Sequence, residues 1–213
     1  MNTTLKKTIA VIAILVLVLV AYYGSYLPLQ KSRSFITAMR SLGPTATLAD
    51  FEKSFAKTLD APSPIGQEEL VRQLGSIALN IVQQNSDPQA IKKIVAIAEK
   101  YYEPIIRRNR GMSFSQNLYI LGSINELAFL KTREPQYFNS AKNYFIKAVE
   151  FGPNRPQALY GTFDIFRLEG NIEGVKKTAN KILEQWPSDE KTRTLLAEFI
   201  KQAEEREKDK APK

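Results

Sequence analysis

An uncharged apolar segment near the amino terminus limits the folds that this chain can adopt. Residues 8–30 read TIAVIAILVLVLVAYYGSYLPLQ and contain no charged residue. As a helix rising about 1.5 Å per residue, the stretch from Thr8 to Leu27 would cover about 30 Å, the thickness of a bilayer's hydrocarbon layer. We therefore expect residues 8–27 to span a membrane once, with residues 1–30 forming a tail and anchor.

A cleaved secretory signal is the alternative for such a segment. The aliphatic run from Ile9 to Ala21 has the length of a signal's apolar region. A cleavage site needs small residues two positions apart, whereas the bulky Tyr22 and Tyr23 follow Ala21 here. With Tyr26, these tyrosines suit the aromatic belt of a lipid–water interface. The sequence thus favours an uncleaved anchor.

Positive charges flank both ends of the apolar segment. Lys6 and Lys7 precede it, and Lys31, Arg33 and Arg40 follow it, so the positive-inside count is close to a tie. A long domain can cross a membrane whatever its charge. We expect the bulk of the chain outside the cytoplasm, by a narrow margin.

The composition argues against most enzyme mechanisms. The 213 residues include no cysteine and no histidine, which removes thiol nucleophiles, imidazole bases and the usual transition-metal ligands. The carboxylate pairs Glu68-Glu69 and Glu204-Glu205 have no nucleophile nearby. Basic residues exceed acidic ones by 30 to 22, but the two are interspersed. We expect no enzyme activity, no cofactor, no metal and no nucleic-acid partner.

After the anchor the chain is expected to be all-α, because apolar residues recur at three and four and no alternating β pattern occurs. Asp87 and Ser113 suit N-caps, while Gly43-Pro44, Gly111 and Pro187 suit helix ends. The expected helices cover residues 31–42, 47–60, 66–85, 88–109, 113–131, 136–151, 155–169, 171–185 and 188–207.

The stretch AKNYFIKAVEFGPNRP, residues 141–156, shows the spacing of a repeated helix pair. Ala141, Phe145 and Ala148 follow at steps of four and three, and Pro153 comes after the helix. In a tetratricopeptide-type repeat, packing residues occupy positions 4, 7, 8 and 11 of the first helix and 20, 24 and 27 of the second, with proline near 32. Setting Pro153 at 32 puts these three residues on the second-helix positions.

The same spacing locates four degenerate helix pairs, although three-and-four spacing also belongs to an ordinary helical bundle. Two pairs fit directly, and the middle two need four and seven extra residues. Asn125, Thr162 and Phe163 depart from the pattern. The matching residues are Phe35, Ala38, Met39, Leu42 with Phe51, Phe55, Thr58; Val71, Leu74, Gly75, Ala78 with Ile91, Val95, Ala98; Leu118, Leu121, Gly122 with Ala141, Phe145, Ala148; and Leu159, Phe166 with Val175, Ala179, Ile182.

Residues 31–187 therefore resemble a tetratricopeptide-repeat domain. The segment AKNYFIKAVEFGPNRPQALYGTFDIFRLEGN is similar to the soluble repeat tail of bacterial O-antigen ligase and polymerase-like proteins. The ligases that this segment resembles carry their catalytic residues on many membrane spans. We expect one span in this chain, so the resemblance does not imply ligase activity. We expect a repeat domain over residues 31–208, closed by a capping helix with Leu195, Leu196, Phe199 and Ile200 on one side, and a disordered tail over 209–213.

The resemblance implies a membrane-anchored scaffold in the bacterial cell envelope that binds a partner protein or peptide. The alternative is an accessory or detached tail of an O-antigen or polysaccharide ligase or polymerase complex, without catalytic residues of its own.

Two surfaces are candidate sites. The concave face of a helical repeat holds extended segments, although each of its residues can equally be an ordinary solvated position. Its candidate residues are Glu69, Arg72, Gln116, Tyr119, Glu126, Tyr160, Asp164 and Arg167. The run EKYYEPIIRRNRG supplies a basic cluster that could contact anionic lipid or a glycan carrier, or could merely offset a helix dipole. That cluster comprises Lys100, Arg107, Arg108 and Arg110.

Overall fold

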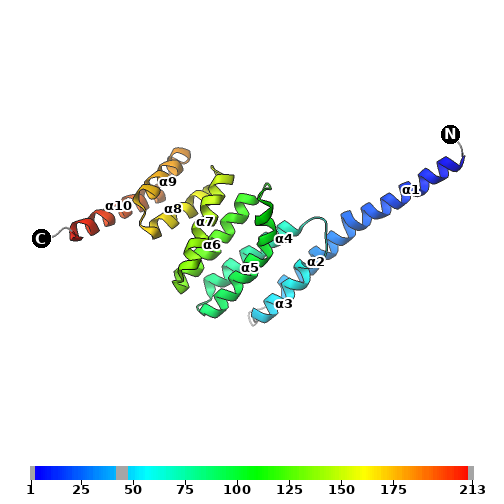
Figure 1. Cartoon of the computed structure of the whole chain (residues 1–213), viewed down its shortest axis with the longest axis horizontal. Helices are drawn as coiled ribbons and strands as arrows, with labels where there is room; N and C mark the ends of the chain where they lie inside the picture. The colour runs from blue at the N-terminus through cyan, green and yellow to red at the C-terminus, as the bar shows by residue number, and fades with distance from the viewer. Residues whose placement is uncertain (1–2, 42–47, 211–213) are drawn as a thin grey trace. The chain divides into compact units, whose positions relative to one another are not determined.

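The computed structural model describes residues 3–41 and 48–210, and within them the chain is helical, with no strand (Figure 1). These residues form nine helices when Thr3–Ser41 is taken as one. The all-α prediction is confirmed. The chain divides into two compact units, Met1–Leu74 and Gly75–Lys213, which are described separately below.

One long helix opens the first unit. α1 (Thr3–Ala21), a π-helical turn η1 (Tyr22–Tyr26) and α2 (Leu27–Ser41) follow one another without a break, so the helix expected to begin at residue 31 has no separate start. Pro28 explains the π turn, because it lacks an N–H and its ring crowds the carbonyl four residues earlier. The wider turn accommodates this, with the N–H of Leu27 donating to the carbonyl of Tyr22.

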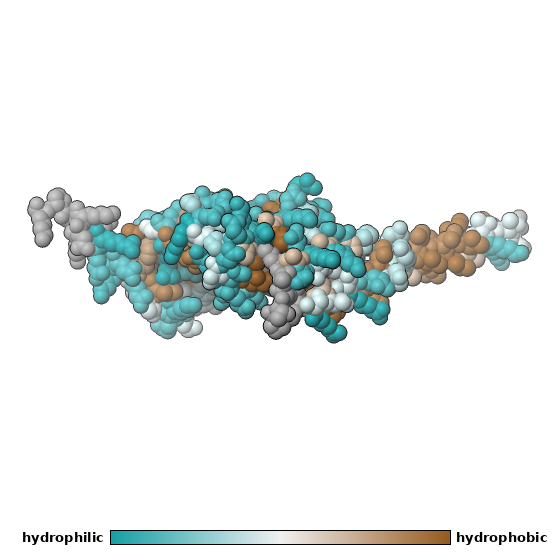
Figure 2. Space-filling model, turned by 90° about the horizontal axis from the view of Figure 1, so that it is seen from below, coloured by the Kyte–Doolittle hydropathy of each residue, from teal (hydrophilic) through white to brown (hydrophobic). Residues whose placement is uncertain are grey.

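The amino-terminal part of this helix is apolar and exposed. Within the described residues, Thr3–Ser41 is the one helix long and apolar enough to cross a bilayer, a property that membrane anchors share with signal sequences. Leu17 is 66% exposed and Val20 61%. Figure 2 shows the apolar part of this helix as a continuous hydrophobic band.

α2 packs on α3 (Leu48–Leu59) through aromatic rings. The ring of Phe55 lies 5.3 Å from that of Phe35 and 4.8 Å from that of Phe51, and all three are buried. The predicted pairing of these two helices is therefore present. Met39, which was predicted to pack, is 42% exposed.

A buried lysine joins the end of α3 to α2. The Nζ of Lys31 donates to the carbonyl of Leu59 at 3.2 Å and also to that of Ala61. Beside it, the hydroxyls of Ser34 and Thr58 lie 2.8 Å apart. The predictions for Leu42, Gly43-Pro44 and Thr47 concern residues outside those that the structure describes.

The remaining helices lie within three residues of their predicted ends. They are α4 (Gln67–Gln84), which runs from the first unit into the second, α5 (Pro88–Arg108), α6 (Phe114–Thr132), α7 (Pro135–Phe151), α8 (Pro156–Glu169), α9 (Ile172–Gln185) and α10 (Glu190–Lys210). α10 includes Asp209 and Lys210, which were predicted to be disordered; residues 211–213 lie outside the described chain.

Local capping explains some of the helix ends. The carboxylate of Asp87 accepts from the N–H groups of Gln89 and Ala90, as predicted. Ser113 makes no such bond, because its backbone is not in the extended conformation that aims a cap. α5 ends on Asn109 with a left-handed φ of 52°, two residues before Gly111, which was predicted to stop it.

In the second unit, each helix from α5 onward packs on the next, and α6 also packs on α8. Contact between alternate helices is what a stacked helix-pair repeat produces. α5 and α6 have 21 and 19 residues, compared with 14 each for α8 and α9, which matches the predicted extra turns.

The tightest packing surrounds Phe145 of α7. This side chain is fully buried, and a Cβ added at Gly122 of α6 would lie 2.6 Å from its Cε1. A Cβ added at Gly161 of α8 would overlap the same ring. Close contact between α7 and α8 thus comes from Gly161, two residues before Phe163, which is buried in the following core cluster.

Candidate functional site

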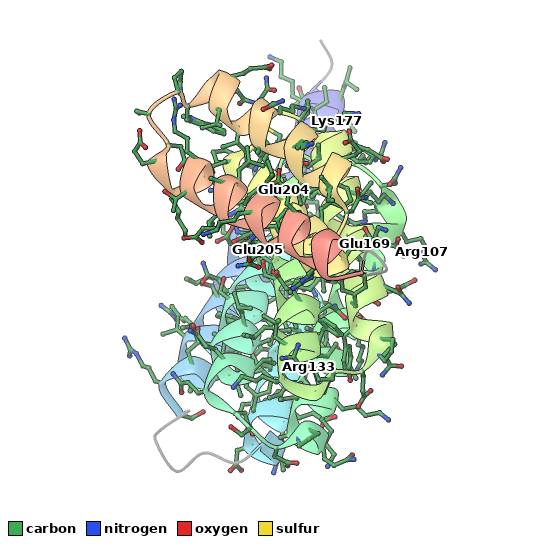
Figure 3. All side chains as sticks on the ribbon, turned by 90° about the vertical axis from the view of Figure 1, so that its left-hand side faces the viewer. Arg107, Arg133, Glu169, Lys177, Glu204 and Glu205 are labelled. Atoms are coloured by element: carbon green, nitrogen blue, oxygen red, sulfur yellow. The ribbon has the colours of Figure 1, made fainter. Side chains whose placement is uncertain are left out.

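A groove of about 540 Å³ lies between α6, α8 and the carboxy-terminal half of α10. Figure 3 views the unit with α10 nearest the reader, and labels Glu204 and Glu205 on it. The groove, called the α10 groove below, combines charged and apolar side chains. Its lining includes Glu126, Leu130, Asp164, Arg167, Leu168, Phe199, Gln202 and Arg206.

Glu126 is the unusual ionisable group of the α10 groove. Burial raises the pKa of its carboxyl to about 7, with a further contribution from the negative charge of Asp164. Across the groove, Asp164 Oδ1 accepts from Arg167 Nη1 at 2.9 Å, so this pair is already matched. Within the described residues Glu126 has no basic partner in an ion pair. The groove therefore holds one carboxylate that a cation from outside could neutralise.

Arg167 contacts an aromatic ring through its guanidinium group and also has a hydrogen-bond donor without a partner among the described residues. Its guanidinium carbon lies 5.6 Å from the centroid of the Phe163 ring, a cation–π contact. Its Nε is buried and makes no hydrogen bond within the described part of the chain. A carbonyl or carboxylate oxygen of a bound segment would satisfy this donor.

The exposed apolar side chains of the α10 groove are Leu130 and Leu168, which are 38% and 43% exposed. On α10, Phe199 is half-buried against the last core cluster. Apolar side chains around one partly buried carboxylate suit a peptide segment that presents aliphatic residues and one lysine or arginine.

The other predicted groove residues do not join this site. Tyr160 donates from its hydroxyl to Asp189 Oδ2 at 2.6 Å, and this hydrogen bond is the main reason that the pKa of Tyr160 rises to about 12. Gln116 and Tyr119 line a separate hollow of about 90 Å³. In the first unit, Glu69 and Arg72 pair with each other along α4, and this pairing lowers the pKa of Glu69.

The four residues of the predicted basic cluster do not form a single site either. Lys100 and Arg107 line a hollow of about 630 Å³ together with Glu99, Glu103 and Tyr144. Lys100 Nζ lies 4.9 Å from the centroid of Tyr101, and Arg107 is 3.8 Å from Glu103. Arg107 is thus paired with an acidic neighbour, whereas Lys100 contacts an aromatic ring. Arg108 and Arg110 are exposed at the end of α5.

Sequence reasoning missed two features that the fold creates. Glu99 and Tyr144 meet in the second hollow, where burial raises the pKa of Glu99, and burial together with Glu99 raises that of Tyr144 to about 12. Gln202 and Arg206 complete the α10 groove, although α10 was predicted to be a cap. No local motif marks either set, since the pairing depends on how the helices stack.

Within the described residues, no three His, Cys, Asp or Glu side chains lie close enough to hold a metal ion. Comparison with protein-family models, with curated proteins and with solved structures found no match to this chain.

Proposed function

We propose that this chain is a single-pass membrane protein whose helical region binds a segment of a partner protein and holds it at the membrane. The α10 groove is the binding site. The observation that supports it best is Glu126, a partly buried carboxylate without a basic partner among the described residues, at the edge of a groove with exposed leucines.

The continuous helix Thr3–Ser41 supports an anchor over a cleaved signal. Lys31, Phe35 and Ala38 are buried where α2 packs on α3, and they follow the apolar stretch without a break in the helix. Cleavage after Ala21 would cut within this helix and free the end of a packed repeat. In the proposal residues 8–27 cross the bilayer, with η1 at the lipid–water interface, where the rings of Tyr22 and Tyr26 stack at 5.6 Å.

In the proposal the helical region lies outside the cytoplasm. Protease added to intact and then permeabilised inner-membrane vesicles would test this with a carboxy-terminal tag. In inside-out vesicles we expect the tag to be protected until permeabilisation. Cleavage without permeabilisation would place the helices in the cytoplasm.

The partner segment can be characterised by its chemistry. Desolvating a carboxylate costs free energy unless a cation comes with the ligand, so the segment should place lysine or arginine at Glu126. Aliphatic side chains of the segment would cover Leu130 and Leu168, and a backbone carbonyl would accept from Arg167 Nε.

Site-specific photo-crosslinking in living cells tests this site. A photoreactive residue replacing Leu168 in the full chain should capture one partner. The same residue replacing Ile65, which is 58% exposed and outside the groove, serves as the matched control. Glu126→Lys should abolish capture at position 168, and Glu126→Gln should weaken it.

Exchanging the charges of Glu126 and of the basic residue that it contacts tests whether the two meet. Replacing the captured segment's basic residue by glutamate should restore crosslinking to Glu126→Lys. Equal capture at positions 168 and 65, or capture unaffected by Glu126→Lys, would refute the groove as the binding site.

A further inference from the structure

The turn between α5 and α6 carries the most exposed apolar side chain in the described chain outside α1 and η1. Met112 is 95% exposed. The chain turns through positive φ values at Asn109 and Gly111. The turn is tethered to the next one, because Arg155 Nη2 donates to the carbonyl of Met112 at 3.0 Å. The structure thus presents this methionine to solvent on a tethered turn.

The turn between α7 and α8 lies at the same end of the helices (Figure 1). Ser115 Oγ donates to the carbonyl of Ala148 at 2.7 Å, and the ring of Phe114 lies 4.7 Å from that of Phe151. Phe151 remains 43% exposed. Two neighbouring turns therefore offer apolar side chains to solvent side by side.

Cations surround these apolar side chains. Arg108 and Arg110 are exposed, and neither they nor Arg155 make an ion pair within the described residues. We call Arg108, Arg110, Met112, Phe151 and Arg155 the basic tip. Lys147 adds a charge 5.6 Å from the Phe114 ring, and Glu150 is the acidic residue next to Phe151. The basic tip is net positive.

We propose that the basic tip docks on an anionic phospholipid surface. Met112 and Phe151 enter the headgroup region, while the arginines contact phosphates. The mixture of charge and exposed apolar area favours lipid over nucleic acid, since phosphates of a nucleic acid would be matched by the arginines alone. The membrane anchor of the proposed function contributes only proximity, by raising the local concentration of lipid.

Docking would add a second membrane contact to a protein already tethered by its amino terminus. Each arginine near an anionic surface should change the docking equilibrium about fivefold, since it contributes about a kilocalorie per mole. The contact should weaken at high salt, because the charges are exposed and screened.

The chain lacks cysteine, so a single introduced cysteine can carry a fluorescent probe in the full protein. Met112→Cys, labelled with an environment-sensitive dye, would be reconstituted into nanodiscs of phosphatidylcholine alone or mixed with phosphatidylglycerol. Some lipids would bear a spin label at the headgroup to quench nearby dye. Gln89→Cys is the control, because Gln89 is exposed at the opposite end of α5, about 30 Å away along the helix.

We expect quenching at position 112 only in nanodiscs with phosphatidylglycerol, reversed by salt and reduced about 25-fold in docking equilibrium by Arg108→Gln with Arg110→Gln. Quenching equal in the two lipids, equal at position 89, or unchanged by the arginine substitutions would overturn the proposal. Co-elution of the protein with nanodiscs reports the anchor separately, so failure of the anchor and failure of the basic tip are distinguishable.

Discussion

The packing of Phe145 predicts that Gly161→Ala destabilises the protein. The added methyl group would meet ring atoms of Phe145, among them Cζ at 2.8 Å. The ring is fully buried, and Gly122 of α6 approaches its Cδ1, Cε1 and Cζ atoms as well, so little room remains for it to move. We expect overpacking near the upper end of about 1–3 kcal/mol, less about 1 kcal/mol gained because alanine favours helix over glycine. The net loss is about 2 kcal/mol.

Gly174→Ala is the matched control for this substitution. A Cβ at Gly174 would lie 2.8 Å from Phe166 Cδ2, but Phe166 is only half-buried and its ring can move. We expect this variant to be as stable as the wild type or slightly more stable.

Urea and thermal unfolding in detergent micelles would measure these effects through Trp186, the single tryptophan, which packs on the neighbouring core cluster. The melting temperature of Gly161→Ala should fall by roughly 4–8 °C. Phe145→Leu makes room for the methyl group, so the double variant should lose less stability than the sum of the single variants. Additive losses, or a Gly161→Ala variant as stable as Gly174→Ala, would refute the packing argument.

Three further predictions concern ionisable and polar groups. The pKa of Glu126 in the folded chain is about 7, above its ordinary value of 4.5, so the folded chain binds more protons than the unfolded chain between these pH values. The free energy of unfolding should therefore fall as the pH rises through this window, by at most about 3 kcal/mol. Glu126→Gln should remove this fall, which urea unfolding across pH would measure. Lys31→Met leaves the carbonyl of Leu59 without its donor and should cost about 1–3 kcal/mol, seen as faster amide exchange in α3; an unchanged exchange rate would argue against this contact. Tyr160→Phe removes a hydrogen bond to the charged Asp189 and should cost about 1.5–3 kcal/mol, with exchange rising in the first turn of α10 and not in α5.

The helices were predictable because their signals are local. Asp87 caps the second and third residues after it, and Val175, Ala179 and Ile182 mark one helix face by their spacing alone. The close contact at Gly161 was not predictable, since it depends on how far α8 slides along α7. The partner of Tyr160 lies 29 residues away, and no local pattern connects the two.

Some of the residues predicted for the concave face lie together in the structure and others lie apart. Glu126, Asp164 and Arg167 do line one groove, because α6 packs on α8 and brings corresponding faces together. No pattern in the sequence indicated that α10 would also line this groove. A helix expected only to cap a core can complete a groove when its far half extends past that core.

Phe199 of α10 contributes both to the last core cluster and to the α10 groove, but other residues of this helix serve one role each, which allows the two roles to be separated. Leu195 and Leu196 pack on the last core cluster, whereas Gln202 and Arg206 line the α10 groove and are exposed. Gln202→Ala with Arg206→Ala should therefore leave Trp186 emission and the unfolding midpoint within experimental error, while lowering photo-crosslinking at position 168. Removing all of α10 could not make this distinction, because it would expose the core as well. If the double variant crosslinks as efficiently as the wild type, α10 acts on the groove only as a cap, and the bound segment lies on α6 and α8 alone.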